Sequence, residues 1–404
     1  MTEQAKVPAI RFAGFTDPWE QRKLGDIAER VTRKNENNES DLPLTISAQH
    51  GLIDQRLFFN AQVASRDMSG YYLLRQGEFA YNKSTSADSP WGAIKRLTRY
   101  EKGCVSTLYI CFALLNANPD YLVTYYETNR WHKAVQMIAA EGARNHGLLN
   151  IAPDDFFDTM VSLPESQAEQ QTIGAFFSRL DSLITLHQRK YDKLCVLKKS
   201  MLDKMFPKGG SLYPEIRFSG FTDPWEQRKL GELFEESDER ASDREILSVS
   251  VANGIYPASE SDRETNPGAS LANYKIVHFG DVVYNSMRMW QGAVDASRYD
   301  GIVSPAYVVA RPNSEVYARF FARLLRQPML LKQYQQVSQG NSKDTQVLKF
   351  DDFASIGISM PVSENEQRQI GGFFDRLDSL ITLHQRKLEL LRNIKKSMLD
   401  KMFV

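Results

Sequence analysis

The sequence has few cysteines and no net charge. Among its 404 residues there are three cysteines, Cys104, Cys111 and Cys195, with no C-x-x-C pair. This pattern is typical of reduced thiols rather than of a disulfide framework. Lys plus Arg and Asp plus Glu number 50 each. The overall charge therefore predicts no general affinity for nucleic acid, and any DNA binding has to be local.

Long apolar runs are missing as well. Hydrophobic residues make up 42% of the chain, enough for ordinary buried cores. No stretch reaches the roughly 18 uninterrupted apolar residues of a membrane helix, and the first ten residues contain no apolar run of signal-peptide length. We therefore expect a globular protein of two or three domains, located in the cytoplasm and without a membrane partner.

The common catalytic motifs are also absent from the sequence. There is no phosphate-binding G-x-x-x-x-G-K-[ST], no G-x-G-x-x-G after a strand, no H-E-x-x-H and no G-x-S-x-G. We find no NPPY-like tetrapeptide of an amino-methyltransferase and no nuclease-like carboxylate cluster. These absences favour a non-catalytic recognition protein that binds no metal and no cofactor itself.

Identical phrases occur twice along the chain. "FTDPWEQRKLG" fills residues 15–25 and 221–231, "RLDSLITLHQRK" fills 179–190 and 376–387, and "KKSMLDKMF" fills 198–206 and 395–403. Each half thus opens with one shared phrase and closes with two others. Between these phrases the two sequences differ, although short similar segments such as "GEFAYN" and "GDVVYN" occur at corresponding positions. The halves are predicted to share one fold that carries two different surfaces.

Each half has the pattern of an α+β domain. In the opening phrase, Asp17 and Pro18 suit the N-cap and first position of a short helix, and Trp19 suits a buried anchor. Hairpins are predicted at 44–53 and 247–256, with turns at Gly51 and Gly254. Buried strands are predicted at 104–115 and 302–310, and helical runs at 119–138 and 314–337, the second broken at Pro328.

The closing phrases predict two helices of about 40 residues each. Their heptads place apolar residues on a broad stripe, and antiparallel pairing would give both halves the same environment. That pairing would bring His187 and His384 together as register-setting residues, and Lys190 and Lys387 would mark where the coil opens to another subunit. The residues predicted for coil or partner contacts are Phe176, Leu180, Leu183, His187, Lys190, Leu194, Phe373, Leu377, Leu380, His384, Lys387 and Leu391.

The expected architecture is therefore α+β, with two pseudo-two-fold-related α/β domains separated by two long antiparallel helices that form a coiled coil. The predicted domain bounds are 1–162 for the first domain and 163–208 for the first spacer helix. They are 209–359 for the second domain and 360–404 for the second spacer helix.

These phrases resemble a known family. The pattern P-x-x-x-x-E-Q-x-x-I-x-x-F-F occurs at residues 164–177 and 361–374. With "FTDPWEQRKLG" and "GEFAYN", it resembles the specificity subunit of type I restriction-modification systems over essentially the whole chain. The resemblance implies two target-recognition domains, each of which reads one half of a bipartite, asymmetric site in double-stranded DNA.

The resemblance also implies partners. Two adenine-N6 methyltransferase subunits would dock on the helices, which set the spacer of the site. Restriction subunits would translocate on ATP and cut the DNA. S-adenosylmethionine, ATP and Mg would be bound by those partners.

Base readout needs arginine, asparagine or glutamine side chains on loops, with lysine and hydroxyl groups on phosphates. Polar loops at 81–91 and 141–147 meet this need in the first half, and loops at 284–292 and 338–346 in the second. The candidate DNA-binding residues are Lys83, Ser84, Thr85, Arg144, Asn145, His146, Asn285, Arg288, Gln291, Asn341 and Lys343.

Two alternatives stay open from the residues alone. The chain could be an adaptor whose two domains bind two proteins through a rigid coil. It could also be an enzyme with a site around His132, His146 and Cys111.

Overall fold

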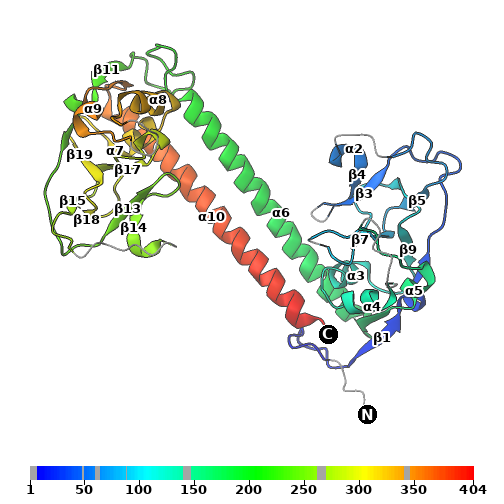
Figure 1. The fold of residues 1–404 in the computed structure, drawn as a ribbon. Coiled ribbons are helices and arrows are strands. Elements are labelled where there is room, and N and C mark those ends of the chain that lie inside the picture. Colours follow the sequence, from blue (N-terminus) through cyan, green and yellow to red (C-terminus); the bar gives the residue numbers. More distant parts are fainter. Residues whose placement is uncertain are drawn as a thin grey trace. The chain divides into compact units, whose positions relative to one another are not determined.

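The chain consists of two compact units, each made of two stretches of sequence. A computed structural model describes residues 7–47, 50–59, 64–87, 89–139, 147–261, 270–340 and 346–404. The first unit contains Met1–His187 and Lys387–Val404, and the second contains Gln188–Arg386. Each unit combines an α+β domain with parts of two long helices, α6 (Gln167–Lys204) and α10 (Glu364–Met402) (Figure 1). Because the unit boundary cuts through these helices, the predicted domain bounds stay a prediction.

The first domain begins with strand β1 and ends with strand β10. Its elements are β1 (Trp19–Lys23), α1 (Leu24–Ile27), β2 (Ala28–Arg30), β3 (Leu44–Ser47), β4 (Gly51–Asp54), α2 (Gln55–Phe58), β5 (Tyr72–Arg75), β6 (Phe79–Asn82), β7 (Ala93–Arg96), β8 (Lys102–Val105), β9 (Ile110–Leu114), α3 (Pro119–Tyr125), α4 (His132–Ile138), α5 (Pro153–Phe157) and β10 (Met160–Pro164).

The second domain repeats this order. Its elements are β11 (Glu226–Lys229), η1 (Leu230–Glu232), β12 (Phe234–Glu236), β13 (Leu247–Ser250), β14 (Gly254–Pro257), η2 (Ala258–Glu260), β15 (Lys275–Val277), β16 (Val282–Asn285), η3 (Met289–Gln291), β17 (Val294–Ala296), β18 (Gly301–Val303), β19 (Tyr307–Pro312), α7 (Ala318–Leu324), α8 (Pro328–Val337), α9 (Phe350–Ala354) and β20 (Gly357–Met360).

The sheets of the two domains have the same topology. The main sheet has the order β2-β9-β6-β7 in the first domain and β12-β19-β16-β17 in the second. Smaller antiparallel pairs also correspond: β1-β10 with β11-β20, β3-β4 with β13-β14, and β5-β8 with β15-β18. The prediction that both halves share one fold is confirmed at the level of strand order.

The predicted hairpins form where glycine permits the turn. Gly51 and Gly254 have φ values of 70° and 66°, in the left-handed region that favours glycine. Each predicted buried strand is instead two strands. Turns in which the amides of Tyr109 and Tyr307 donate to the carbonyls of Ser106 and Ser304 separate β8 from β9 and β18 from β19. The sequence pattern was apolar on both sides of the turn and so concealed it.

Each of the two predicted helical runs consists of two short helices. Residues 119–138 form α3 and α4 rather than one helix, and the second run divides into α7 and α8. The predicted break at Pro328 is confirmed, because this proline occupies the first turn of α8, where its missing amide costs no hydrogen bond.

The opening phrase is not a helix, so that prediction was wrong. Residues 19–23 form β1, which pairs antiparallel with β10 from Trp19 opposite Pro164 to Lys23 opposite Met160. A helix this short is only marginally stable alone, and the free edge of β10 offers a full set of backbone hydrogen bonds. Trp19 and its copy Trp225 are nevertheless buried anchors, with 6% and 0% exposure.

The end of each long helix completes the core of a domain from the other half of the sequence. Met402 and Phe403 belong to the first core, where Phe403 contacts the rings of Trp19 and Tyr121. In the second core, Met205 and Phe206 occupy the equivalent place. Both units therefore depend on a helix end contributed from a distant part of the chain.

The two helices run antiparallel within each unit. In the first unit Asp181 pairs with Lys395 at 2.5 Å, and the ring centroids of Phe177 and Phe403 lie 6.0 Å apart. The second unit repeats this pattern with Asp378 and Lys198 at 2.5 Å and with Phe374 and Phe206 at 6.2 Å. In both units the contacts advance along one helix as they recede along the other.

Candidate nucleic-acid interface

The two candidate loops of the first domain are hydrogen-bonded to each other at their bases. The amide and hydroxyl groups of Thr85 both donate to the Gly147 carbonyl, at 2.6 and 3.0 Å. The amide of Leu149 donates to the carbonyl of Lys83, and Ser84 forms a β-bridge with Leu148. Loop 81–91 is therefore joined to residues 147–149, whereas residues 141–146 of the second candidate loop lie outside the described residues.

Lys83 is less available than the sequence predicts. Its Nζ donates to the Ile151 carbonyl at 3.2 Å, and burial lowers the pKa of its ammonium group. This hydrogen bond links loop 81–91 to residue 151, and a DNA contact of Lys83 stays a prediction. Arg144, Asn145 and His146 lie outside the described residues, and their role stays a prediction.

A cavity of about 260 Å³ opens between loop 81–91 and residues 147–149. It is lined by Thr85, Ser86, Pro90, Trp91 and Gly147–Leu149. An indole face next to hydroxyl groups can stack on a base or hold the edge of one. Trp91 entered the sequence-based prediction only as the last residue of loop 81–91. Its place in a loop that also carries serine and threonine was the available signal.

The second domain joins its candidate loops at the equivalent point. The Leu348 amide donates to the Ser286 carbonyl, and Gln339 and Val347 pair with each other through backbone hydrogen bonds at the ends of the other loop. Asn341 and Lys343 lie outside the described residues, so their role stays a prediction.

The remaining candidates of the second domain cluster around η3. Arg288 is exposed, and its guanidinium donates to the Gln291 side chain at 3.2 Å. The Asn285 side chain accepts from the Met287 amide, and the Trp290 indole donates to the Met287 carbonyl. These bonds shape a turn that presents Arg288 to solvent, the geometry that a base-reading arginine needs.

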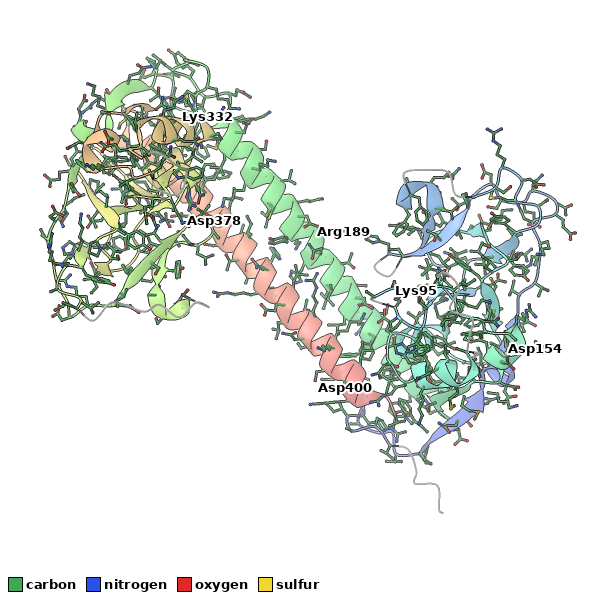
Figure 2. The ribbon with its side chains drawn as sticks, in the orientation of Figure 1. Lys95, Asp154, Arg189, Lys332, Asp378 and Asp400 are labelled. Atoms are coloured by element: carbon green, nitrogen blue, oxygen red, sulfur yellow. The ribbon has the colours of Figure 1, made fainter. Side chains whose placement is uncertain are left out.

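The long helices carry a second, exposed apolar stripe. The predicted residues Leu180 and Leu377 are buried, Phe176, His187 and Leu194 are half-buried like their copies Phe373, His384 and Leu391, and Lys190 and Lys387 are exposed. Leu183 and Leu380 are 44% and 43% exposed. Sequence reasoning missed Leu186 and Leu383, both 46% exposed, which extend the same stripe at i+3 spacing. Arg189, labelled on α6 in Figure 2, follows Leu186 by three residues in the sequence.

The described residues offer little support for an enzyme. Burial raises the pKa of the Cys111 thiol to about 12, so this sulfur stays protonated and is a poor nucleophile. His132 packs its ring against Trp131, and burial lowers its pKa. His146 lies outside the described residues.

Within the described parts of the chain, no group of three or more His, Cys, Asp or Glu residues is arranged to hold a metal ion. In the same parts, none of the helices is both long and apolar enough to cross a membrane.

Comparison with known proteins adds a family and a fold. Residues 222–393 match the type I restriction modification DNA specificity domain. The S subunit of a type I restriction-modification system from M. genitalium is 13% identical, with a TM-score of 0.59 over 99% of both chains. The HsdS subunit from Thermoanaerobacter tengcongensis is 16% identical, with a TM-score of 0.42 over 97% of this chain and 98% of that one. A search of curated protein sequences returned no significant match.

The matched domain covers the second half, and the identical phrases of the first half extend the pattern to the rest of the chain. The likeness to the M. genitalium protein shows that the fold is shared along nearly the whole length. Residues 222–393 thus match a type I restriction modification DNA specificity domain, within a chain whose fold is shared with the M. genitalium S subunit.

Proposed function

We propose that each unit reads one half of a bipartite, asymmetric site in double-stranded DNA. The observation that carries this proposal is the repeated pair of loops: both domains join two polar loops at the same point of the same fold, with different residues in each. A shared frame with two different surfaces suits a site whose two halves differ in sequence.

The exposed stripe on the helices is proposed to dock two adenine-N6 methyltransferase subunits, one for each unit. Leu183 and Leu186 in the first unit have the same sequence surroundings as Leu380 and Leu383 in the second, so identical partners would meet identical surfaces. Two leucines left half exposed on each long helix are typical of a surface that another helix covers.

The chain itself is proposed to be non-catalytic. S-adenosylmethionine, ATP and Mg would be held by the methyltransferase and restriction subunits. The whole complex would act in the cytoplasm, where the DNA lies, and would methylate or cleave this DNA at sites that the present chain selects.

Docking can be tested with Leu183→Asp/Leu380→Asp in the full chain, co-expressed with the methyltransferase subunit. A carboxylate on the contact stripe would be buried unpaired, so we expect the complex to be lost on gel filtration. Thr185→Asp/Thr382→Asp is the matched control, since both threonines are exposed on the same helices. A complex that survives the leucine changes would refute docking on this stripe.

DNA reading is tested with the purified complex at several salt concentrations. We expect site-specific binding that weakens steeply with salt, because phosphate contacts release counterions. An adaptor for two proteins would show no such DNA affinity.

A further inference from the structure

Each domain packs on its long helix at a glycine. A Cβ added at Gly174 of α6 would lie 2.8 Å from Asp120 Cβ in α3, and one added at Gly371 of α10 would lie 3.2 Å from the carbonyl carbon of Arg319 in α7. A Cβ at Gly174 would clash with α3, and one at Gly371 would require the α7 backbone to shift by a few tenths of an ångström. Asp120 and Arg319 therefore occupy equivalent positions at the two contacts between domain and helix.

A glutamine fixes the same register at both contacts. The Gln170 side chain accepts from the amide of Asn118, the N-cap of α3, at 2.9 Å. Gln367 accepts from the amide of Tyr317, the N-cap of α7, at 2.8 Å. Counting onward from these caps, Thr124 corresponds to Arg323 and Glu127 to Arg326.

The contact in the second unit is rich in arginine on the domain side. Arg319 pairs with Asp375 of α10 at 2.8 Å and with Asp295 of β17 at 3.4 Å. Arg323 pairs with Asp375 at 2.9 Å and with Asp378 at 2.8 Å. The Arg319 and Arg323 side chains are only 12% and 9% exposed, so they depend on these carboxylates.

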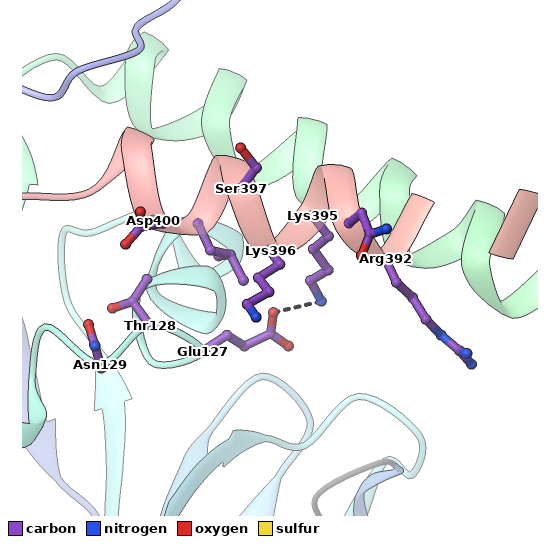
Figure 3. Close-up of a pocket in the computed structure, with 10 residues that line it drawn as sticks. Glu127, Thr128, Asn129, Arg392, Lys395, Lys396, Ser397 and Asp400 are labelled. Carbon is purple, nitrogen blue, oxygen red and sulfur yellow. Dashed lines mark ion pairs between the residues drawn. The ribbon is translucent and has the colours of Figure 1, made fainter. Parts of the chain in front are cut away.

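The first unit has acidic residues in place of Arg319 and Arg326, and a neutral threonine in place of Arg323. Asp120, in the place of Arg319, accepts from Arg96 of β7 at 2.9 Å. Glu127, in the place of Arg326, pairs with Lys395 of α10 at 2.8 Å (Figure 3). In the two main sheets Tyr81 pairs with Ile94 and Tyr284 pairs with Val294. The next residues, Lys95 and Asp295, are therefore in equivalent positions and have opposite charges.

The two long helices are nearly identical where they meet these domains. Residues 176–190 and 373–387 differ at one position, which is Ser178 on α6 and Asp375 on α10. This position lies one helical turn beyond Gly174 or Gly371, on the same face. The other acidic residue of the contact, Asp181 or Asp378, is shared, and so is its lysine partner.

We propose that position 178/375 matches each recognition domain to its own helix. Serine on α6 accommodates a domain that presents the carboxylate of Asp120, whereas aspartate on α10 binds a domain that presents the guanidinium of Arg319. This position thus determines which kind of domain can pack on α6 and which on α10, independently of what that domain recognises.

The test is native-state hydrogen exchange on the full chain, with α3 and α7 followed separately. Asp375→Ser removes one carboxylate partner from each of the buried Arg319 and Arg323 side chains. We therefore expect hydrogen exchange in α7 to rise roughly 10- to 100-fold, with α3 unchanged. Ser178→Asp places a carboxylate next to Asp120, and we expect exchange in α3 to rise roughly threefold with α7 unchanged. Adding Asp120→Asn should remove most of that rise.

Ser182→Asp is the matched control, since Ser182 is exposed one turn farther along α6. It should leave α3 unchanged. The proposal is overturned if Ser182→Asp acts like Ser178→Asp, or if Asp375→Ser leaves α7 as protected as before.

Discussion

A buried carboxylate explains the glutamate in the repeated E-Q pattern. Glu169 accepts a bidentate pair of hydrogen bonds from Arg11, at 2.6 and 2.7 Å, and a third from the Trp19 indole at 3.4 Å. Its side chain is 1% exposed. The second unit repeats this lock with Glu366, Arg217 and Trp225. The arrangement joins the start of each half to the start of its long helix.

Removal of this carboxylate should be costly. Glu169→Ala leaves the Arg11 guanidinium in a largely buried site without its partner, and we expect a loss of about 3–5 kcal/mol in the free energy of unfolding. Glu165→Ala, an exposed change four residues earlier, is the control. Calorimetric unfolding of both variants checks the prediction, and equal stability of the two would contradict it.

A prediction about DNA belongs to Arg288, the exposed guanidinium beside η3. If it reads guanine through two hydrogen bonds, Arg288→Ala should cost about 1–3 kcal/mol in site binding and relax one base position of the second half-site. Binding measured on a set of single-base variants of the site checks this. Uniformly weaker binding with unchanged base preference would instead assign Arg288 to a phosphate.

At the residue scale, the sequence indicated the right anchors but not their contacts. Trp19 was expected to be buried from its size and position, and it is. Its hydrogen bond to Glu169 joins residues 150 positions apart. No local pattern predicts such a contact. The same limit applies to the hydrogen bond between the Lys83 ammonium group and the Ile151 carbonyl, 68 positions apart.

Among the elements, the long helices were predicted best, because a period of 3.5 residues repeated over 40 residues is an unambiguous signal. Two heptad assignments were compatible with the sequence of α6. The side chains that face inward are Phe177, Leu180 and Ile184, not the predicted set Phe176, Leu180 and Leu183. The stripe was broad enough to fit both frames. Packing against the domains selects between them, and it leaves the leucines of the other frame exposed.

The swapped helix ends lead to a paired prediction. Phe403→Ala removes a buried ring from the first core and Phe206→Ala from the second, each at an expected cost of about 3–5 kcal/mol. Because each ring serves one core, Phe403→Ala should raise hydrogen exchange in α3 alone and Phe206→Ala in α7 alone. If Phe403→Ala raised hydrogen exchange in α7, or Phe206→Ala raised it in α3, the assignment of helix ends to cores would be wrong.

The pH dependence of the second unit follows from Asp375 on α10. Burial opposes its ionisation, but Arg319 and Arg323 outweigh burial and hold the pKa of this carboxyl below its ordinary value. Its stabilising contribution is therefore present above the unfolded pKa, about 4, and is lost as the pH falls through the lower folded value.

The matching experiment compares wild type with Asp375→Asn between pH 7 and pH 3. The variant should be less stable at pH 7, and its thermal midpoint should fall less on acidification than that of wild type. Parallel curves for the two proteins would contradict the depressed pKa.

At the scale of the whole molecule, the repeat defines the frame. The identical sequences form strands β1 and β11, the contact between the two long helices, and the helix ends in both units. The sequences that differ form the loops of the two domains. This organisation was predictable because an internal repeat needs no knowledge of structure. The bases that the loops are proposed to read were not predictable, since side chains on loops select bases through geometry that sequence patterns do not encode.

The most direct measurement is a map of N6-methyladenine across the genome of a methylation-free host. This host would express the chain with the proposed methyltransferase partner. The chain would be either unchanged or carry, in place of residues 26–153, the matching segment of a specificity subunit with a different target. The account predicts one bipartite motif for the unchanged chain, and the exchange should alter only one half of it. A motif that changes in both halves, or a stable complex that methylates nothing, would contradict the account.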